Sequence, residues 1–262
     1  MSRRFEAASV LITGAAGGFG SEAARRFADE GARLLLSDLD QAALEAVAAP
    51  LRAAGTAVET LAGDVSRWET AEALVARAVA AYGRLDVAVN NAGIGGGIAK
   101  LPQIEVAQAE RLFAINLMGV FLALKAQIPA MERQFAEDGR GGVILNLASV
   151  AGVVGAPLLA VYSAAKHGVV GLTKSAAGET ARKGIRINCL CPAFARTAMV
   201  ESFLERMEGE AEEAEARVVA HMPMRRMAGP EEVVQAILWA CAPENSFMTG
   251  HALVLDGGLS AV

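Results

Sequence analysis

Short apolar runs alternate with longer helical patterns along most of this chain, and no other feature of the sequence constrains the fold as strongly. The apolar runs cover residues 9–13, 33–36, 57–61, 85–90, 143–147, 185–190 and 252–255. Helical patterns lie between them at residues 19–30, 41–53, 69–81, 107–135 and 162–182. Short strands that alternate with helices of this length indicate βαβ units. The prediction is therefore an α/β fold with a doubly wound, mostly parallel sheet and helices on both of its faces.

One domain is predicted for residues 1–262. Hydrophobic residues make up 53% of the chain and charged residues 20%, which excludes disorder driven by low hydrophobicity. No Pro- or Ser-rich linker divides the sequence. The segment 198–222 interrupts the alternation with many Glu residues, Glu208 and Glu210 among them. This segment is interpreted either as a solvated pair of amphipathic helices or as a lid over a substrate site.

Charge and cysteine content bear on partners and location. The net charge is −5, whereas nucleic-acid-binding surfaces are usually basic, so no nucleic-acid partner is expected. No run approaches about 18 uninterrupted apolar residues and no signal peptide is recognised, so no membrane partner is expected. Three sparse cysteines indicate reduced thiols and a cytoplasmic location. No second Cys or His pair accompanies Cys189 and Cys191, so no metal site is expected.

A glycine cluster follows the first apolar run and opens the first helical pattern. Residues 13–20 read TGAAGGFG, in which Gly14, Gly18 and Gly20 accompany Phe19. Glycines allow a close backbone approach to a pyrophosphate, and the N–H groups at the start of a helix bind phosphate oxygens. A bare glycine-rich turn is the alternative, but the order strand, loop, helix favours dinucleotide binding.

Asp38 closes the second apolar run, 24 positions after Gly14. A carboxylate at this place accepts hydrogen bonds from the adenosine ribose hydroxyls and repels a 2′-phosphate. The glycine loop has no Arg or Lys that would neutralise such a phosphate. The expected cofactor is therefore NAD rather than NADP. The alternative is a solvated turn residue, for which Asp40 is the better example.

These motifs together resemble those of the short-chain dehydrogenase/reductase superfamily, in its branch of roughly 250 residues. They run in order from residue 10 to residue 258: TGxxxGxG at 13–20, Asp64-Val65, Asn90-Asn91-Ala92-Gly93, Asn116, Ser149, YxxxK from Tyr162 to Lys166, Pro192, Thr197 and LDGG at 255–258. The resemblance implies a seven-stranded Rossmann fold. The sequence departs from the family pattern at Ala193, where Gly is usual, and at Phe19, where Ile is usual.

The resemblance also implies which residues bind the cofactor and which carry the reaction. The implied cofactor-binding residues are Gly14, Gly18, Phe19, Gly20, Asp38, Leu39, Asp64, Val65, Asn91, Ala92, Gly93, Tyr162, Lys166, Pro192 and Thr197. The implied catalytic residues are Asn116, Ser149, Tyr162 and Lys166.

The reaction expected from these side chains interconverts a secondary alcohol and its ketone by hydride transfer, with Tyr162 as general acid/base. Lys166 lies four residues after Tyr162 and so shares one face of a helix with it. A free Tyr has a pKa of about 10, which a nearby ammonium lowers. Ser149 can stabilise charge on the substrate oxygen. Asn116 either satisfies backbone groups or, as the resemblance implies, holds a water in a proton relay from Lys166.

The expected substrate is a hydrophobic alcohol or ketone, because the candidate pocket residues are apolar or small. They are Gly95, Val150, Val153, Val154, Leu158, Leu159, Phe194, Met199 and Phe203. Arg196 is the one cation considered for a charged substrate. Two alternatives stay open: a 3-oxoacyl-thioester reductase, a type that usually prefers NADP, and a non-catalytic dinucleotide-sensing protein on the same fold. The resemblance further implies a homotetramer.

Overall fold

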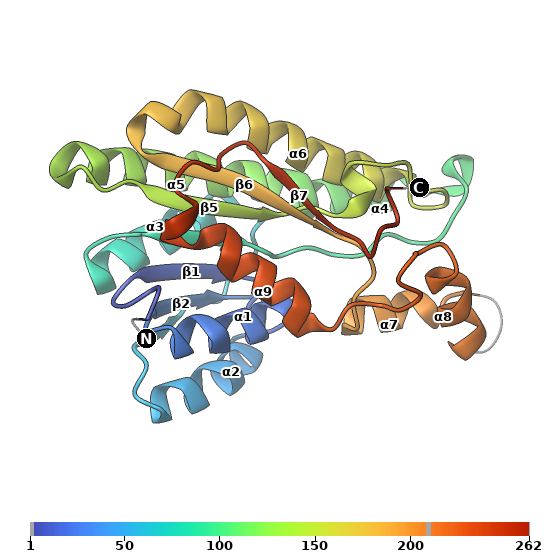
Figure 1. The fold of residues 1–262 in the computed structure, drawn as a ribbon, viewed down its shortest axis with the longest axis horizontal. Coiled ribbons are helices and arrows are strands. Elements are labelled where there is room, and N and C mark those ends of the chain that lie inside the picture. Colours follow the sequence, from blue (N-terminus) through green and yellow to red (C-terminus); the bar gives the residue numbers. More distant parts are fainter. Residues whose placement is uncertain (1–2, 208–210, 262) are drawn as a thin grey trace.

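Seven parallel strands form one sheet in the computed structural model, which describes residues 3–207 and 211–261 (Figure 1). The strand order is β3-β2-β1-β4-β5-β6-β7, so the chain reverses its winding direction between β1 and β4. The strands are β1 (Ser9–Thr13), β2 (Arg33–Ser37), β3 (Val58–Thr60), β4 (Val87–Asn90), β5 (Gly142–Leu147), β6 (Ile185–Pro192) and β7 (Ala252–Leu255). All seven lie where the alternation predicts them, and the doubly wound Rossmann fold is confirmed.

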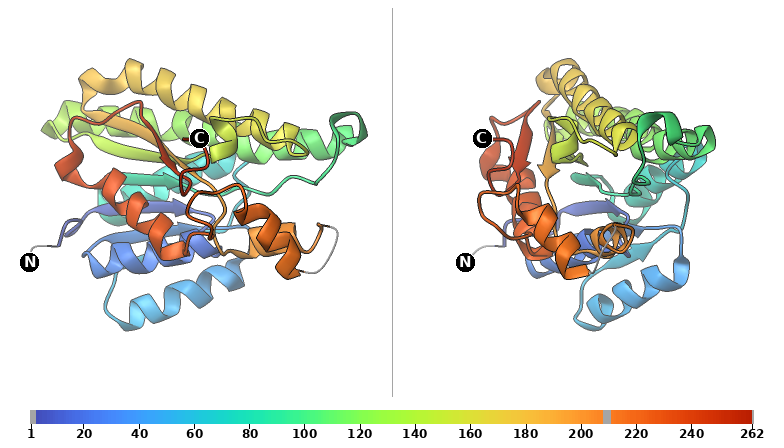
Figure 2. Two further views of the ribbon diagram at one scale, coloured as in Figure 1. Left: turned by 45° about the vertical axis from the view of Figure 1, so that its right-hand side comes forward. Right: turned by 90° about the vertical axis from the view of Figure 1, so that its right-hand side faces the viewer.

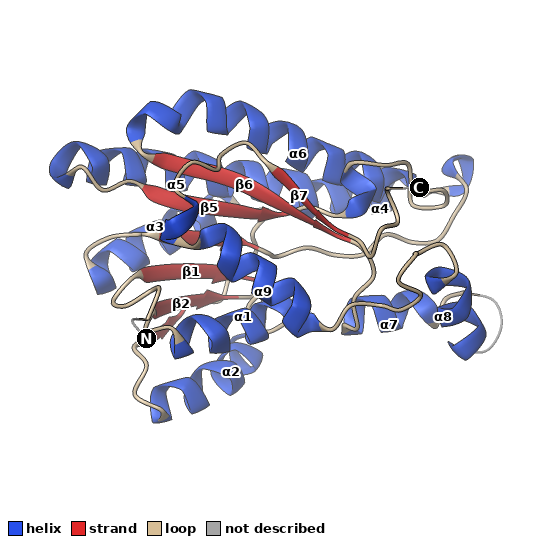
Figure 3. Cartoon of the chain, in the orientation of Figure 1, coloured by secondary structure: helices blue, strands red, loops and turns tan. Residues whose placement is uncertain are grey.

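Both faces of the sheet are apolar because helices cover both (Figure 3). In β1, Val10 and Ile12 belong to one buried cluster, whereas Leu11 belongs to the other. This alternation follows from the pleat of the strand, and burial on both faces makes the run continuously apolar. The first cluster includes side chains of α1 (Gly18–Asp29), α2 (Gln41–Ala53) and α9 (Pro230–Cys241), and the second those of α3 (Trp68–Tyr82), α5 (Gly119–Asp138) and α6 (Ala160–Thr180).

The single helix predicted over residues 107–135 is interrupted in the structure. A π-helical turn at Ala114–Met118 joins α4 (Val106–Phe113) to α5, and Asn116 lies in that turn. Turns of this kind are frequent at functional sites. The combined stretch Val106–Asp138 is long and apolar enough to cross a membrane by length and composition alone. A core helix meets the same criterion, and α5 packs here against α3 and α6.

The segment 198–222 forms two short helices, α7 (Ala198–Leu204) and α8 (Ala211–Val219). Residues 208–210 of the predicted lid lie outside the described residues. Both helices lie beyond the carboxyl ends of the strands, which the arrowheads mark in Figure 1. The two further views in Figure 2 show the same arrangement. Leu204, Val218 and Met222 belong to a small apolar cluster that is separate from the two clusters on the sheet. The segment therefore borders the edge of the sheet at which such folds bind ligands.

Candidate active site

The glycine loop between β1 and α1 is so tight that two of its positions accept only Gly. Gly14 has a φ of +65°, a conformation that L side chains rarely adopt. A Cβ on Gly20 would overlap the carbonyl oxygen of Gly14. Gly17 is the N-cap of α1 and has no side chain to offer, and among the described residues no side chain caps the first N–H groups of the helix. The loop thus fits the close approach of a pyrophosphate to backbone donors.

Asp38 lies just beyond β2 and is hydrogen-bonded to the glycine loop. One carboxylate oxygen accepts the N–H of Ala16 at 3.0 Å, and the other accepts the N–H of Leu39 at 2.8 Å. Both partners are neutral backbone groups, so they orient the carboxylate without neutralising its charge. Asp40 instead caps α2, where its side chain accepts the N–H of Ala42 at 2.8 Å.

Thr13 and Asn91 join the loop after β4 to the glycine loop. The side-chain amide of Asn91 donates to the carbonyl oxygens of Thr13 and Gly14, each at 3.0 Å. The hydroxyl of Thr13 accepts the N–H groups of Asn91 and Ala92, each at 3.1 Å. Four hydrogen bonds therefore hold the two predicted cofactor-binding loops side by side.

The other predicted cofactor-binding residues lie along the same edge. Thr197 caps α7. A Cβ on Gly18 would lie 3.2 Å from the methyl group of Thr197, so the loop after β6 contacts the glycine loop. Asp64 accepts the N–H and the hydroxyl of Ser66 at 2.9 and 2.8 Å. At this edge Leu39 and Val65 lie in loops, Phe19 lies in the first turn of α1, and Pro192 ends β6.

Ser149 and Tyr162 line one cavity of about 840 Å³ at this edge. Ser149 follows β5, and its Oγ accepts the N–H of Ala151 at 3.2 Å. Tyr162 lies in the first turn of α6. Burial raises the pKa of Tyr162, and the hydrogen bond with Ser149 opposes that rise. The lowered pKa expected from the sequence is therefore not found in the protein alone, because desolvation disfavours the phenolate.

Lys166 is buried behind Tyr162, with 5% of its surface exposed. Its Nζ donates to the carbonyl oxygen of Leu147 at 2.7 Å and lies 5.7 Å from the centre of the Tyr162 ring. Burial lowers the pKa of Lys166 to about 8, because the ammonium loses its hydration. The spacing of four residues thus places both side chains on one face of α6, as predicted.

Asn116 is fully buried in the π-helical turn. Its Oδ1 accepts the N–H of Ile94, and its Nδ2 donates to the carbonyl oxygen of Ile94, both at 2.8 Å. The amide therefore satisfies backbone groups, which is one of the two roles that the sequence left open. A Cβ on Gly93 would lie 3.2 Å from the Asn116 Oδ1 and 3.7 Å from the Lys166 Nζ, so these residues lie close together.

Apolar side chains form most of the cavity wall. The predicted pocket residues that line it are Gly95, Val150, Val154, Leu159, Phe194, Met199 and Phe203. Two predicted residues do not line it. Leu158 is exposed and has a φ of +67°, so the chain turns there and Leu159 lines the cavity instead. Val153 packs against the buried cluster on one face of the sheet.

Arginines that the sequence did not single out also line this cavity. Arg196, the one cation considered from the sequence, does not line it and forms an ion pair with Glu215 of α8 at 2.5 Å. Arg111 of α4, Arg206 after α7 and Arg217 of α8 do line it. No motif marks these positions, because the three segments meet only in the folded chain.

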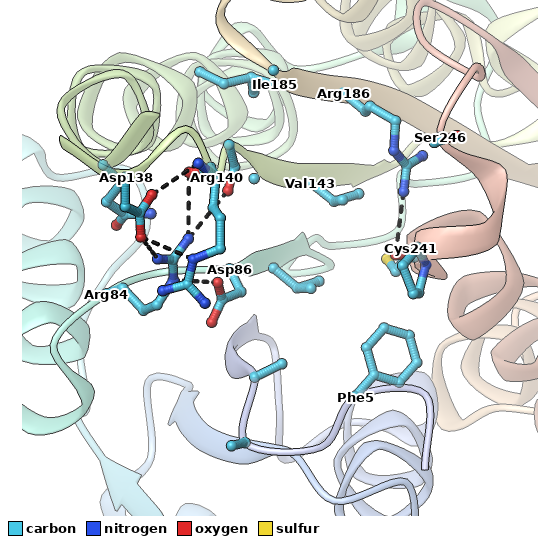
Figure 4. Close-up of a pocket in the computed structure, with 18 of the residues that line it drawn as sticks. Phe5, Arg84, Asp86, Asp138, Arg140, Val143, Ile185, Arg186, Cys241 and Ser246 are labelled. Carbon is cyan, nitrogen blue, oxygen red and sulfur yellow. Dashed lines mark hydrogen bonds and ion pairs between the residues drawn. The ribbon is translucent and has the colours of Figure 1, made fainter. Parts of the chain in front are cut away.

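A hollow of about 1060 Å³ lies at the opposite edge of the sheet, near the amino ends of the strands (Figure 4). Arg84 forms ion pairs there with Asp86 and with Asp138, the latter at 2.7 Å. Arg186 donates to the carbonyl oxygen of Cys241 at 3.3 Å at the end of α9. These charged groups are satisfied within the protein, and none of the predicted site residues lines this hollow. The candidate active site is therefore at the carboxyl edge.

Relatives that act on ring alcohols are similar to this chain over nearly its whole length. A family model described as Enoyl-(Acyl carrier protein) reductase matches residues 14–260. A 2,5-dichloro-2,5-cyclohexadiene-1,4-diol dehydrogenase of Sphingobium indicum is 37% identical over 97% of both chains. A cyclohexanol dehydrogenase of an Acinetobacter species is 35% identical and covers 100% of this chain and 98% of its own. A cis-4-hydroxycyclohexanecarboxylate dehydrogenase of Sinomonas cyclohexanicum is 37% identical over 100% of both.

Solved structures agree with this fold. Levodione reductase superposes with a TM-score of 0.93 at 35% identity, over 98% of this chain and 99% of that one. A 3-ketoacyl-(acyl-carrier-protein) reductase from Brucella melitensis, complexed with NADH, superposes with a TM-score of 0.87 at 34% identity, over 98% of this chain and 99% of that one. A variant of actinorhodin polyketide ketoreductase with NADPH superposes with a TM-score of 0.91 at 36% identity, over 100% of both chains. Proteins of this fold and degree of identity thus bind either dinucleotide.

Proposed function

The chain belongs to the short-chain dehydrogenase/reductase family, and on that basis we propose that it interconverts a hydrophobic, cyclic secondary alcohol and its ketone with NAD as cofactor. One observation carries the proposal: Ser149 and Tyr162 line the same largely apolar cavity, with Lys166 buried behind Tyr162. The ring alcohols in the names of the relatives support a ring-shaped substrate.

In the proposed oxidation, the phenolic oxygen of Tyr162 takes the hydroxyl proton of the alcohol. The Ser149 hydroxyl donates to the substrate oxygen and stabilises the charge that develops there. The Lys166 ammonium and the positive nicotinamide favour the phenolate, against the burial that raises the pKa of Tyr162. When bound, NAD supplies the acceptor for the hydride of the carbinol carbon. In the reverse direction, Tyr162 returns the proton to the ketone oxygen.

The proton that Tyr162 takes must reach solvent from a buried site. Lys166 has a pKa lowered to about 8, so it exchanges a proton near neutral pH more readily than an exposed lysine. Asn116 lies close to Lys166 and holds the backbone of Ile94. We therefore assign Lys166 to proton transfer and Asn116 to holding the relay.

NAD rather than NADP is proposed because Asp38 carries an un-neutralised charge at the end of β2. Its hydrogen bond with the N–H of Ala16 orients the carboxylate beside the glycine loop. Ribose hydroxyls can donate to such a carboxylate, whereas a 2′-phosphate would be repelled by it. The tight glycine loop and the uncapped start of α1 fit the pyrophosphate of either dinucleotide.

The second candidate is reduction of a 3-oxoacyl thioester. The Brucella melitensis reductase supports this candidate, because its name gives that reaction and its structure contains NADH rather than NADPH. A dinucleotide-sensing protein is less well supported, because Asn116, Ser149, Tyr162 and Lys166 are all present and brought together.

Assembly, location and the lid are part of the same proposal. The homotetramer that the family resemblance implies is proposed, and the exposed apolar side chains of Trp239 in α9, Phe247 before β7 and Val254 in β7 are available for contacts between copies. Sedimentation as a monomer at micromolar concentration would contradict it. A cytoplasmic location stays a prediction. Movement of α7 and α8 over the cavity as a lid is likewise proposed, because both helices carry cavity-lining residues.

The decisive experiment is a turnover assay with the purified protein. We expect NAD-dependent oxidation of cyclohexanol and larger ring alcohols, followed as NADH absorbance, with weaker activity when NADP replaces NAD. Activity confined to 3-oxoacyl thioesters would select the second candidate. NAD binding without turnover of any alcohol, ketone or thioester in the panel would select the sensing protein.

A further inference from the structure

Two arginines from separate segments line the candidate active site. Arg111 lies on α4 and Arg206 follows α7, and both are exposed. Both line the cavity of about 840 Å³ and also an adjoining cavity of about 260 Å³. Tyr162 lines the same two cavities, so the guanidinium groups border the space in which the reacting oxygen is held.

Among the described residues of the cavity wall, no acid compensates the charge of these arginines. None of the described residues that line either cavity is Asp or Glu. Within residues 3–207 and 211–261, neither Arg111 nor Arg206 forms an ion pair, and Arg206 donates to the Ser202 hydroxyl at 3.1 Å. Arg196, by contrast, is paired with Glu215. A cleft lined by one sign of charge concentrates ligands of the opposite sign.

Much of the wall of the cavity that Tyr162 and the arginines share is apolar. Val150, Phe194 and Met199 line the cavity together with Ser149 and Tyr162. A ligand that fits this lining has an apolar middle, a hydroxyl or carbonyl at one end, and a negative charge at the other. Guanidinium groups suit a carboxylate, because their N–H donors match its two oxygens in pairs.

We propose that Arg111 and Arg206 bind a carboxylate of the substrate, carried by the ring at the end remote from the reacting hydroxyl. The inference rests on the proposed function and narrows its substrate class from hydrophobic ring alcohols in general to ring alcohols that carry a carboxylate. Arg206 follows α7, so the bound carboxylate would also link the lid segment to α4.

The test compares two substrates with the same hydroxycyclohexane ring, 4-hydroxycyclohexanecarboxylate, whose carboxyl group is charged, and its methyl ester, in which that group is neutral. We expect the wild-type enzyme to prefer the acid, through a lower KM. In Arg111→Gln and in Arg206→Gln, the ratio of kcat/KM for the acid to that for the ester should fall about tenfold, and further in the double variant. Arg182→Gln changes an exposed arginine of η4 (Ala181–Lys183) that lines neither cavity, and it should keep the wild-type ratio.

A wild-type enzyme that prefers the ester, or variants that keep the wild-type ratio, would overturn the inference and leave the proposed function standing. Calorimetric titration with cyclohexanecarboxylate, which has no hydroxyl to oxidise, decides the matter without turnover. Binding weakened about tenfold in Arg111→Gln and Arg206→Gln supports the carboxylate site even if no alcohol is oxidised. Equal binding to wild type and variants, or none to either, overturns it.

Discussion

The carboxylate of Asp38 accepts a hydrogen bond from the backbone N–H of Ala16, at 3.0 Å, across the turn between β1 and α1. The acid therefore belongs to the glycine loop as much as to β2, and its orientation is set before any ligand binds. A second bond from the N–H of Leu39, at 2.8 Å, holds the other oxygen. This arrangement presents one negative charge beside the loop that fits a pyrophosphate.

Asp38→Asn should weaken the preference for NAD. Asn keeps an oxygen that can accept the Ala16 N–H but removes the charge that repels a 2′-phosphate. We expect the ratio of kcat/KM for NAD to that for NADP to fall by at least about tenfold, since close charges interact by a few kcal/mol. Asp40→Asn is the matched control: Asn also caps helices well, so the ratio should stay at the wild-type value.

Tyr162→Phe should lower kcat for alcohol oxidation by about 10² to 10⁴, the usual contribution of general acid–base catalysis. NADH binding, measured by fluorescence titration, should persist because the ring and Lys166 remain. Turnover equal to that of the wild type would rule out Tyr162 as the acid/base.

Tyr82→Phe is the control for that variant, since Tyr82 is the one other tyrosine of the chain. Its hydroxyl donates to the carbonyl oxygen of Leu34 at 2.7 Å and accepts the N–H of Glu59 at 3.1 Å, away from the cavity. Tyr82→Phe should cost about 1 kcal/mol in the free energy of unfolding and leave turnover unchanged.

Lys166 should make the stability of the protein depend on pH. The folded chain releases this proton at a pKa of about 8, whereas the unfolded chain holds it up to about 10.5. Between these values the unfolded state binds more protons, so stability rises with pH, by up to about 3 kcal/mol from this group. Below pH 8 the burial of the ammonium lowers stability by its full amount.

Urea unfolding between pH 7 and 10 checks this. The free energy of unfolding of the wild type, minus that of Lys166→Met, should increase over this range, because the variant lacks the titrating group. Lys174→Met changes an exposed lysine on the same helix, and the difference in free energy of unfolding between the wild type and this variant should stay constant over the same pH range. If the free energy of unfolding changed with pH in the same way for the wild type and for Lys166→Met, the lowered pKa of Lys166 would be contradicted.

Gly20→Ala should disrupt the cofactor loop. Its Cβ would overlap the Gly14 carbonyl and lie 2.7 Å from the Ala15 Cα, so the loop must shift. We expect a loss of more than about 2 kcal/mol in unfolding free energy and loss of NADH binding. Gly171→Ala is the contrast, because a Cβ there meets nothing within 4 Å. It should stabilise α6 by about 0.5–1 kcal/mol.

Most of the fold could be predicted because local patterns report burial. A strand covered on both faces is largely apolar, and β1, β2 and β5 are recognisable for that reason. The interruption at Ala114–Met118 was not predicted, because a π-helical turn keeps the apolar character of the helix around it. The bounds of α9 were also not predicted, although Pro230 begins it at a position that helices favour.

The positions of the glycine loop, Asp38 and the Tyr162–Lys166 pair could be located from short spacings in the chain. The pKa of Tyr162 could not, because it depends on how deeply the fold buries the ring. Apolar character predicts both Leu158 and Leu159 in the cavity, but the chain turns at Leu158, which has a positive φ, and only Leu159 lines the cavity.

The sheet, the order of its elements and the residues with the chemistry for hydride transfer follow from the amino-acid sequence, because each depends on neighbours along the chain. The tertiary packing instead determines which cationic side chains line the substrate cavity. Arg196 is drawn away by Glu215, whereas Arg111 and Arg206, 95 positions apart, line one space. The effect of a surface charge depends on the groups around it, and two residues that are distant in the chain line the same cavity only because the packing of α4 and of the segment after α7 brings them there.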